Sequence, residues 1–366
     1  MSFESGSLSL RIFHLPQPLP SDAVARFAEH AAPPISTLGA GQIHGWVTGR
    51  HLLDRNITDD TALYAGFLRL SLLQAERKIP EPLLRAECKM EEIALQQAKG
   101  KERLSARERS EIKKSIVERL LPTMPPQLKG ISLVAAPGTS ALYASALSDK
   151  QIDAFVVGVS HPLGIQPIPV TPEVASLLHG QYNTHDWSPA SFTPELENEH
   201  AGQLPGEDFL TWLLFLTEAR GGIMTIDGLG KIALMIDGPF LLAREGSGAH
   251  EAVLRKGEPR LGAETKTALL SGKKLRRAKL TLATSDEHQW SVTIDHTFAF
   301  RSLKLPEGEK LDPASKFQER MFFLDQFREA FFILYQSFCK ERSTPATWSA
   351  TLEEMRAWIT SRTARS

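Results

Sequence analysis

The chain has 366 residues, of which 42% are hydrophobic and 23% are charged, and its formal net charge at pH 7 is −1. A chain of this size predicts either two α+β domains or one elongated domain with a helical extension, and its composition excludes wholesale disorder. Near-neutrality excludes binding to nucleic acid through overall charge, so such binding requires basic residues to gather on one surface.

No segment has the features of a membrane span or of a secretory signal. The most apolar run, FLTWLLFL at 209–216, is shorter than the ~20 residues that cross a bilayer. The N-terminal MSFESGSLSL lacks the basic and apolar regions of a signal peptide. The two cysteines, Cys88 and Cys339, have no metal-ligand spacing and fit reduced thiols. We therefore expect a cytoplasmic protein with no membrane association and no cofactor.

The first part of the sequence predicts an N-terminal α+β domain over residues 1–180. Alternating apolar residues in 7–13 predict a half-buried strand, and an amphipathic helix capped by Ser21 is expected to follow. Residues 31–60, rich in Gly, Pro, His and Asp, are expected to be irregular, whereas 64–78 predict a strand that ends in charged residues.

Residues 81–121 differ from their surroundings because they are strongly charged and contain no aromatic residue. They include ten Lys or Arg and eight Glu. Narrow apolar stripes follow two helical segments, Gly100 interrupts the pattern, and Ser105 with Glu108 forms a capping-box signature for the second helix. The pattern predicts a projecting helical hairpin, which buries little surface alone and is expected to pack on a partner.

Between the hairpin and the second domain, the sequence predicts more strands and one helix. Two strands are expected in 130–146, a helix after the capping-box signature of Ser148 and Gln151, and a strand in 165–170. The loop 180–205, rich in Pro, Asn and His, is interpreted as the boundary between the two halves.

Residues 205–366 predict a C-terminal α+β domain. Its central element is expected to be the helix 315–338, which is apolar nearly all round and therefore belongs in a core or an interface. The other predicted helices are at 207–220, 262–271 and 347–361, and the predicted strands are at 223–244, 275–283, 289–295 and 297–303. The fold class is thus α+β, with antiparallel or mixed sheets, covering helices and an elongated or horseshoe-shaped protomer.

The sequence contains no complete catalytic or metal-binding motif. GLGKIA at 228–233 lacks the first Gly and the hydroxyl residue of a P-loop, and GVSHPLG at 158–164 is not a nucleophile elbow. The adjacent pairs His185-Asp186 and Asp295-His296 are of a kind that metal-dependent phosphodiesterases use, but we favour loop and turn roles for them. We therefore name no catalytic residue and no metal ligand.

The most unusual feature of the second half is a basic segment, residues 255–279. It contains nine Lys or Arg and only two acidic residues. Apolar and basic residues alternate at its end, which predicts a strand that buries one row of side chains and displays the other. The displayed row is either a solvated strand face, whose charges protect a sheet edge, or a surface for a polyanion.

Several landmarks of the sequence occur in a characteristic order. They are an early Gly45-Trp46, the segment ERKIP at 76–80, the Lys/Arg-rich middle of the hairpin at 99–114, its end at Leu120, Leu121 and Pro122, and the segments 206–215 and 248–282. In this order they resemble the longer variants of the recombination-associated protein RdgC family. The resemblance extends over about 62–170 and 205–341.

The resemblance implies a non-enzymatic protein that binds double-stranded DNA with little sequence preference, although family members have also been labelled exonucleases. It further implies a closed, ring-shaped homodimer around the duplex, which restrains the strand-exchange recombinase during recombination or replication at the nucleoid. The family has Arg-Ala-Phe after the hairpin, whereas this chain has Thr123, Met124 and Pro125, so the exposed aromatic residue of the ring interface is missing.

Two groups of basic residues are predicted to contact DNA. The group from the basic segment comprises Arg255, Lys256, Lys273, Lys274, Arg276, Arg277 and Lys279. The group from the hairpin comprises Lys99, Lys101, Arg103, Lys113 and Lys114. Two alternatives stay open, namely a Mg²⁺-dependent exonuclease that acts on DNA and an adaptor that uses the hairpin for protein partners only.

Overall fold

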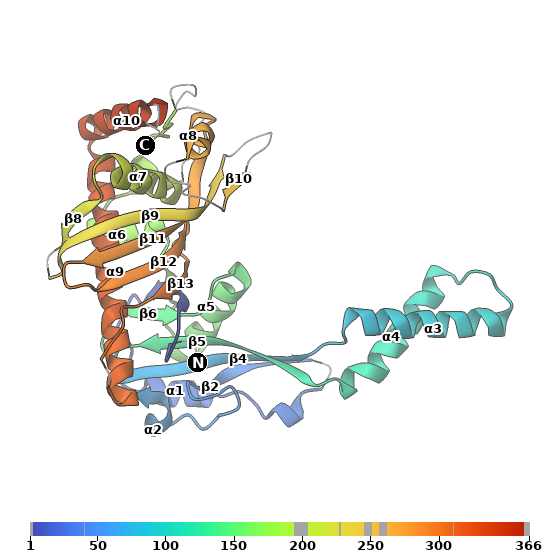
Figure 1. The fold of residues 1–366 in the computed structure, drawn as a ribbon. Helices are drawn as coiled ribbons and strands as arrows, with labels where there is room; N and C mark the ends of the chain where they lie inside the picture. The colour runs from blue at the N-terminus through green and yellow to red at the C-terminus, as the bar shows by residue number, and fades with distance from the viewer. Residues whose placement is uncertain are drawn as a thin grey trace. The chain divides into compact units, whose positions relative to one another are not determined.

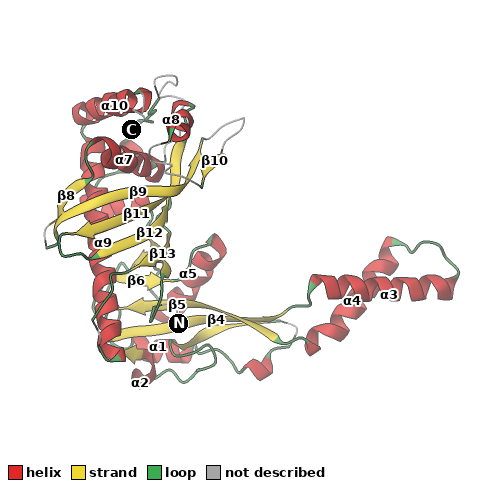
Figure 2. Ribbon diagram, in the orientation of Figure 1, coloured by secondary structure: helices red, strands yellow, loops and turns green. Residues whose placement is uncertain are grey.

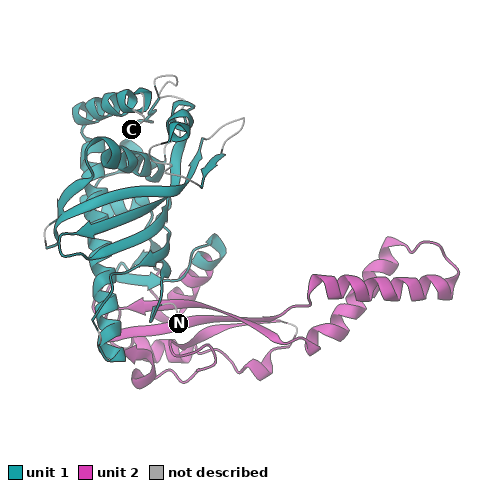
Figure 3. Ribbon diagram, viewed as in Figure 1, with its two compact units in different colours: residues 1–16, 140–152, 167–366 teal, residues 17–139, 153–166 magenta. Residues whose placement is uncertain are grey.

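A computed structural model describes residues 3–39, 41–193, 204–226, 228–244, 251–255, 262–309 and 311–361. Antiparallel strands covered by helices confirm the predicted α+β class (Figures 1 and 2). The chain forms two compact units (Figure 3). Unit 1 comprises residues 1–16, 140–152 and 167–366, and unit 2 comprises residues 17–139 and 153–166.

The predicted boundary at 180–205, of which 194–203 lie outside the described residues, does not separate the two units, because residues 167–366 all belong to unit 1. The reason is long-range strand pairing. β1 (Leu8–His14) pairs antiparallel with β13 (Phe300–Lys304) and also with β6 (Ala141–Ala144), so segments from both predicted domains share one sheet. Pairing between distant segments therefore determines the units, and the composition of the connecting loop does not.

Unit 1 is built on a sheet with the strand order β10-β9-β11-β12-β13-β1-β6. Two short strands extend it, since β8 pairs with β9 and β7 pairs with β1. The bounds of its other strands are Ile168–Pro169 for β7, Ile223–Ile226 for β8, Gly230–Ala243 for β9, Glu251–Leu254 for β10, Lys274–Thr284 for β11 and Gln289–Asp295 for β12.

Among the described residues, five α-helices lie wholly in unit 1. They are α6 (Pro172–Gly180), α7 (Pro205–Ala219), α8 (Ala263–Leu270), α9 (Pro313–Ser343) and α10 (Pro345–Thr360). In the described part of the chain, no helix combines the length and the apolar character that a membrane span requires.

α9, the predicted long helix, supplies the aromatic core of unit 1. Phe331 is fully buried and packs edge-to-face on Phe300 of β13 and on Phe209 of α7. The indole Nε1 of Trp290 on β12 donates a hydrogen bond of 2.9 Å to the Phe323 carbonyl of α9. Each such ring pair contributes about 0.5–1.5 kcal/mol beyond the area that it buries. These contacts hold α9 against one face of the sheet.

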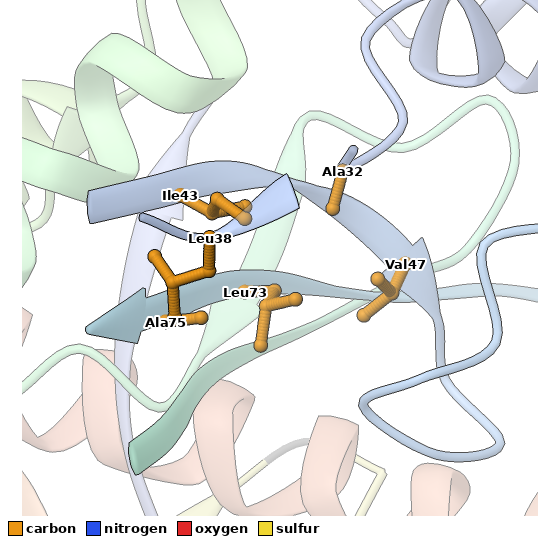
Figure 4. Close-up of a cluster of buried hydrophobic side chains, with 6 residues drawn as sticks. All are labelled: Ala32, Leu38, Ile43, Val47, Leu73 and Ala75. Atoms are coloured by element: carbon orange, nitrogen blue, oxygen red, sulfur yellow. The ribbon is translucent and has the colours of Figure 1, made fainter. Parts of the chain in front are cut away.

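Unit 2 contains the strand order β5-β4-β2, with the short β3 paired to β4. Their bounds are Gln42–Thr48 for β2, Leu63–Tyr64 for β3, Phe67–Arg77 for β4 and Pro126–Ala135 for β5. The helices α1 (Ala23–Glu29) and α2 (Asp59–Ala62) belong to this unit, as does α5 (Asp149–Leu163) from residue 153 onward. A cluster of buried apolar side chains lies on β2 and β4 and on the segment before β2 (Figure 4): Ala32, Leu38, Ile43, Val47, Leu73 and Ala75.

β2 corrects the expectation that residues 31–60 are irregular. Gly45 looks like a break in the strand, but a Cβ there would lie 2.5 Å from the backbone of Ala32, so the close approach of the two segments requires glycine. The next residue, Trp46, is buried against Phe27 and donates from its Nε1 to the Gly158 carbonyl at 2.9 Å. The Gly-Trp pair therefore anchors β2 in the core of unit 2.

The predicted helical hairpin is confirmed as α3 (Glu81–Lys99) and α4 (Ala106–Leu120), which project from the strands of unit 2 (Figure 3). Gly100 ends α3 in a left-handed conformation with φ 60°, and the capping box of Ser105 and Glu108 opens α4. α3 has no buried residue, and Ile116 is the buried residue of α4. The hairpin is thus solvated over most of its surface.

The core position of α9 predicts that alanine substitutions of two of its phenylalanines lower the free energy of unfolding by very different amounts. Phe331→Ala is expected to lower the free energy of unfolding by about 3–5 kcal/mol, because it leaves a cavity in a closely packed core. The control Phe322→Ala removes a ring that is 57% exposed and should change it by less than about 1 kcal/mol. Urea denaturation followed by tryptophan fluorescence measures both, and equal effects would contradict the packing of α9.

Candidate nucleic-acid interface

The end of the basic segment forms β11, an interior strand of unit 1. β11 pairs with β9 on one side and with β12 on the other. The predicted alternation is present, because Ala278, Leu280 and Leu282 are buried whereas Arg277 and Lys279 are half-buried. Since β11 is not an edge strand, protection of a sheet edge does not explain its charges.

Two predicted DNA-contacting residues are instead used inside the fold. The Nζ of Lys274 lies 2.6 Å from Oδ1 of Asp208, and both side chains are less than a tenth exposed. The Nε of Arg276 donates to the Glu207 carboxylate, and 23% of the Arg276 side chain is exposed. Lys274 is therefore inaccessible to a phosphate, and Arg276 is held by a carboxylate, so both stabilise the contact between α7 and β11.

The carboxylates of this contact come from the first turn of α7, which approaches the end of β12 very closely. A Cβ on Gly206 would lie 1.9 Å from the His296 carbonyl oxygen, so only glycine fits. Thr211 of α7 accepts a hydrogen bond of 2.9 Å from the Leu275 amide. Burial raises the pKa of Glu207 to about 7, although the charge of Arg276 opposes the shift.

Arg277 and Lys279 lie on the other face of the sheet, together with residues from neighbouring strands. The register places Lys279 opposite Asp237 of β9 and Thr293 of β12, and Thr293 opposite Arg301 of β13. Residues that pair across antiparallel strands point to the same side, so these four side chains form a row across the sheet.

We call this surface the open face; Figure 1 shows it on the strands β9, β11, β12 and β13, with α9 on the other side. On this face, Met235 is 40% exposed and the Arg301 side chain is 37% exposed. Solvent therefore reaches the open face. Among the described residues, the charged side chains that the register places on this face are the basic Lys231, Arg277, Lys279, Arg301 and Lys304 and the acidic Asp237 and Asp295. Basic side chains thus outnumber carboxylates on this face.

The remaining predicted residues of the basic segment are Lys273, Arg255 and Lys256, and they are not among the residues of the open face. Lys273 is half-buried and donates a hydrogen bond of 3.1 Å to the Ser271 hydroxyl. Arg255 is exposed just after β10, and Lys256 lies outside the described residues. The strand that bears the open face was therefore predicted, but Lys231, Arg301 and Lys304 were not among the predicted residues. The alternation in the predicted strand 297–303 was the signal that could have found Arg301.

In the hairpin, most of the predicted basic residues have acidic neighbours. Lys99 and Lys101 lie 2.8 and 3.4 Å from the same carboxylate oxygen of Glu108, and this contact with Lys99 holds the pKa of Glu108 well below its usual range. Lys114 lies 3.9 Å from Glu118. Arg103 and Lys113 are exposed. The hairpin is therefore a surface of nearly balanced charge, in contrast to the open face.

The adjacent Asp-His pairs take the loop and turn roles that we favoured. His185 and Asp186 lie in a short 3₁₀ helix, and Asp295 accepts backbone hydrogen bonds from Thr297 and Ala299 in the turn after β12. Within the described ranges, no group of three or more His, Cys, Asp or Glu side chains is arranged to hold a metal ion.

Comparison with known proteins adds no relative: no protein-family model matches the sequence, and no curated protein is significantly similar to it. The interpretation of the open face therefore depends on its geometry and charge.

The raised pKa of Glu207 predicts a pH-dependent stability. Between pH 4.5 and about 7 the unfolded chain releases a proton that folded Glu207 retains, so raising the pH through this window destabilises the fold by up to about 3 kcal/mol. Glu207→Gln removes this titration. As the pH rises from 4.5 to about 7, the free energy of unfolding of the variant is expected to fall less than that of the wild type.

Thermal unfolding at about pH 5 and about pH 8 measures the difference, with the exposed Glu353→Gln of α10 as the matched control. The control is expected to keep the pH dependence of the wild type. The same pH dependence in all three proteins would show that Glu207 does not titrate in this window.

Proposed function

We propose that this protein binds double-stranded DNA without sequence preference, and that the open face of unit 1 supplies the contacts. The observation that carries the proposal is the row in which Lys279 of β11 and Arg301 of β13 lie on the solvent-exposed side of the sheet, on either side of Thr293 of β12. Arg277 and Lys304 lie in the two flanking rows. The resemblance to the RdgC family supports a role in recombination or replication at the cytoplasmic nucleoid.

The spacing of these residues fits the phosphate backbone. Neighbouring strands are about 4.8 Å apart, so β11, β12 and β13 distribute basic side chains over about 10 Å. Duplex DNA presents one negative charge per ~1.7 Å of its axis, so several phosphates fall within this width. Long Lys and Arg side chains that contact phosphates do not read base edges, which agrees with binding that is independent of sequence.

We further propose that the protein acts as a homodimer in which the hairpin packs on a second copy. On α3, Leu83, Met90 and Ile93 are 37%, 58% and 43% exposed, and their spacing gathers them on one side of the helix. These side chains would supply the apolar contact that the family obtains from the aromatic residue after its hairpin. The resemblance also supports a ring around the duplex that restrains the strand-exchange recombinase.

Charge reversal on the open face tests DNA binding. The double substitution Arg277→Glu and Lys279→Glu is expected to weaken duplex binding at least about tenfold and to lower the log–log salt slope by about 2, because two phosphate contacts are lost. Fluorescence anisotropy with two unrelated duplexes at several salt concentrations measures both quantities. Both duplexes should be affected alike.

The control for this experiment is Lys340→Glu, which reverses an exposed charge on α9, away from the open face. It should leave the affinity within about twofold of the wild type, since a single remote charge is screened at physiological salt. An unchanged affinity of the double variant would reject the open face as the DNA-binding surface.

Polar substitutions on the hairpin test the dimer. Met90→Gln with Ile93→Gln is expected to weaken self-association roughly tenfold or more, because burial of each apolar side chain contributes about 1.5–3 kcal/mol. Sedimentation equilibrium measures the dissociation constant. Arg85→Gln with Lys89→Gln, on the same helix, is the control that should keep wild-type association. Equal association of both variants would exclude this stripe from the interface.

A further inference from the structure

Three arginines from three different strands lie near Asp295 at one end of the open face. Arg11 lies on β1, Arg277 on β11 and Arg301 on β13, and Asp295 is the last residue of β12. Arg277 pairs directly opposite Asp295 in the register, and Nη2 of Arg301 lies 3.6 Å from Oδ2 of Asp295. The Asp295 turn also holds Arg11, whose Nη2 donates to the Thr297 hydroxyl at 2.9 Å. We call these three side chains the arginine cluster.

Asp295 neutralises only part of this charge. Its Oδ1 is occupied by the turn, since it accepts hydrogen bonds from the Thr297 amide, the Thr297 hydroxyl and the Ala299 amide at 3.1, 2.8 and 3.0 Å. Only Oδ2 is directed toward a guanidinium group. The nearby carboxylates, Asp295 and Asp149, are therefore still fewer than the three positive charges.

The arginine cluster also retains unused donors. The Nε atoms of Arg11, Arg277 and Arg301 are buried and have no hydrogen-bond partner among the described residues. Arg11 is only 4% exposed, so water solvates it poorly. Burial lowers the pKa of its guanidinium, and the nearby Arg301 adds to the shift, whereas the carboxylates of Asp295 and Asp149 oppose it. A buried donor without a partner costs about 1–3 kcal/mol, and more when the group is charged, so a further anion would stabilise this arrangement.

We infer that the arginine cluster is a binding site for a single phosphate group. Guanidinium groups present planar pairs of N–H donors that match the oxygens of a phosphate, and here three of them come from three different strands. The site takes the phosphate group either as part of a DNA backbone or as free phosphate, since both present the same oxygens. It is thus a discrete site at one end of the open face, with which it shares Arg277 and Arg301, and phosphate binding there does not require DNA.

Titration with inorganic phosphate tests the site directly. The titrations use the full-length wild type at constant ionic strength, with sodium chloride as the reference salt, and calorimetry measures the affinity. Arg301→Gln is the main variant because its side chain is partly exposed and its loss should leave the fold intact. We expect it to weaken phosphate binding about tenfold to hundredfold, as for a lost hydrogen bond to a charged group.

Two further variants make the result specific. Arg301→Lys keeps the charge but lacks the paired donors, so it should restore only part of the affinity. Lys279→Gln removes a neighbouring charge of the open face outside the cluster; it is expected to weaken DNA binding and to retain phosphate binding. Absence of phosphate binding to the wild type beyond that of chloride, or equal binding by the wild type and Arg301→Gln, would overturn the inference, whatever the result with DNA.

Competition then identifies the source of the phosphate. If inorganic phosphate displaces duplex DNA from the wild type more strongly than chloride at equal ionic strength, and this difference disappears in Arg301→Gln, a backbone phosphate occupies the cluster. If phosphate and DNA bind together without competition, the cluster is a site for free phosphate. Failure of DNA binding with intact phosphate binding would reject the proposed function and leave the phosphate site standing.

Discussion

The contact between the first turn of α7 and β11 decides which charges of the basic segment remain available to a partner. Asp208 and Glu207 bind Lys274 and Arg276 inside unit 1, and Nε of Arg342 lies 3.8 Å from Asp208. Removing one partner from such a buried pair costs about 3–5 kcal/mol, because the other charge is left uncompensated. These cations therefore hold α7 against the sheet, and the surface chemistry belongs to the residues that follow them on β11.

The side chains of a β-strand point alternately to its two faces, and this alternation determines the direction of the residues that follow Arg276 on β11. Since Ala278 and Leu280 are buried in the core, Arg277 and Lys279 must point to the open face. A register shift by one residue would reverse this arrangement and place cations in the core. The same pairing that stabilises the sheet thus arranges the basic side chains in rows, and a chain of almost neutral total charge presents a basic surface.

The sequence predicted local features well and long-range partners poorly. The hairpin could be predicted because the capping box of Ser105 and Glu108 and the left-handed Gly100 act within a few residues of the helix ends. β2 was missed because residues 31–60 are rich in Gly, Pro, His and Asp, and the reason for Gly45 within the strand is the Ala32 backbone, which local composition does not reveal. The burial of Lys274 could not be predicted, because its partner Asp208 is 66 residues away and a basic run does not reveal which of its charges are buried.

The two carboxylates of the open face, Asp237 and Asp295, have opposite effects on phosphate binding at the exposed lysines and at the arginine cluster. Asp237 lies opposite Lys279, so a phosphate that binds Lys279 must compete with a neighbouring negative charge, which weakens a single contact and makes it sensitive to salt. Asp295 instead uses one oxygen to shape the turn and the other to approach Arg301, and so it helps to position the arginines before any ligand arrives. Preorganised donors lose less conformational entropy on binding. The arginine cluster is therefore expected to hold a phosphate group more tightly than the exposed lysines of the same face.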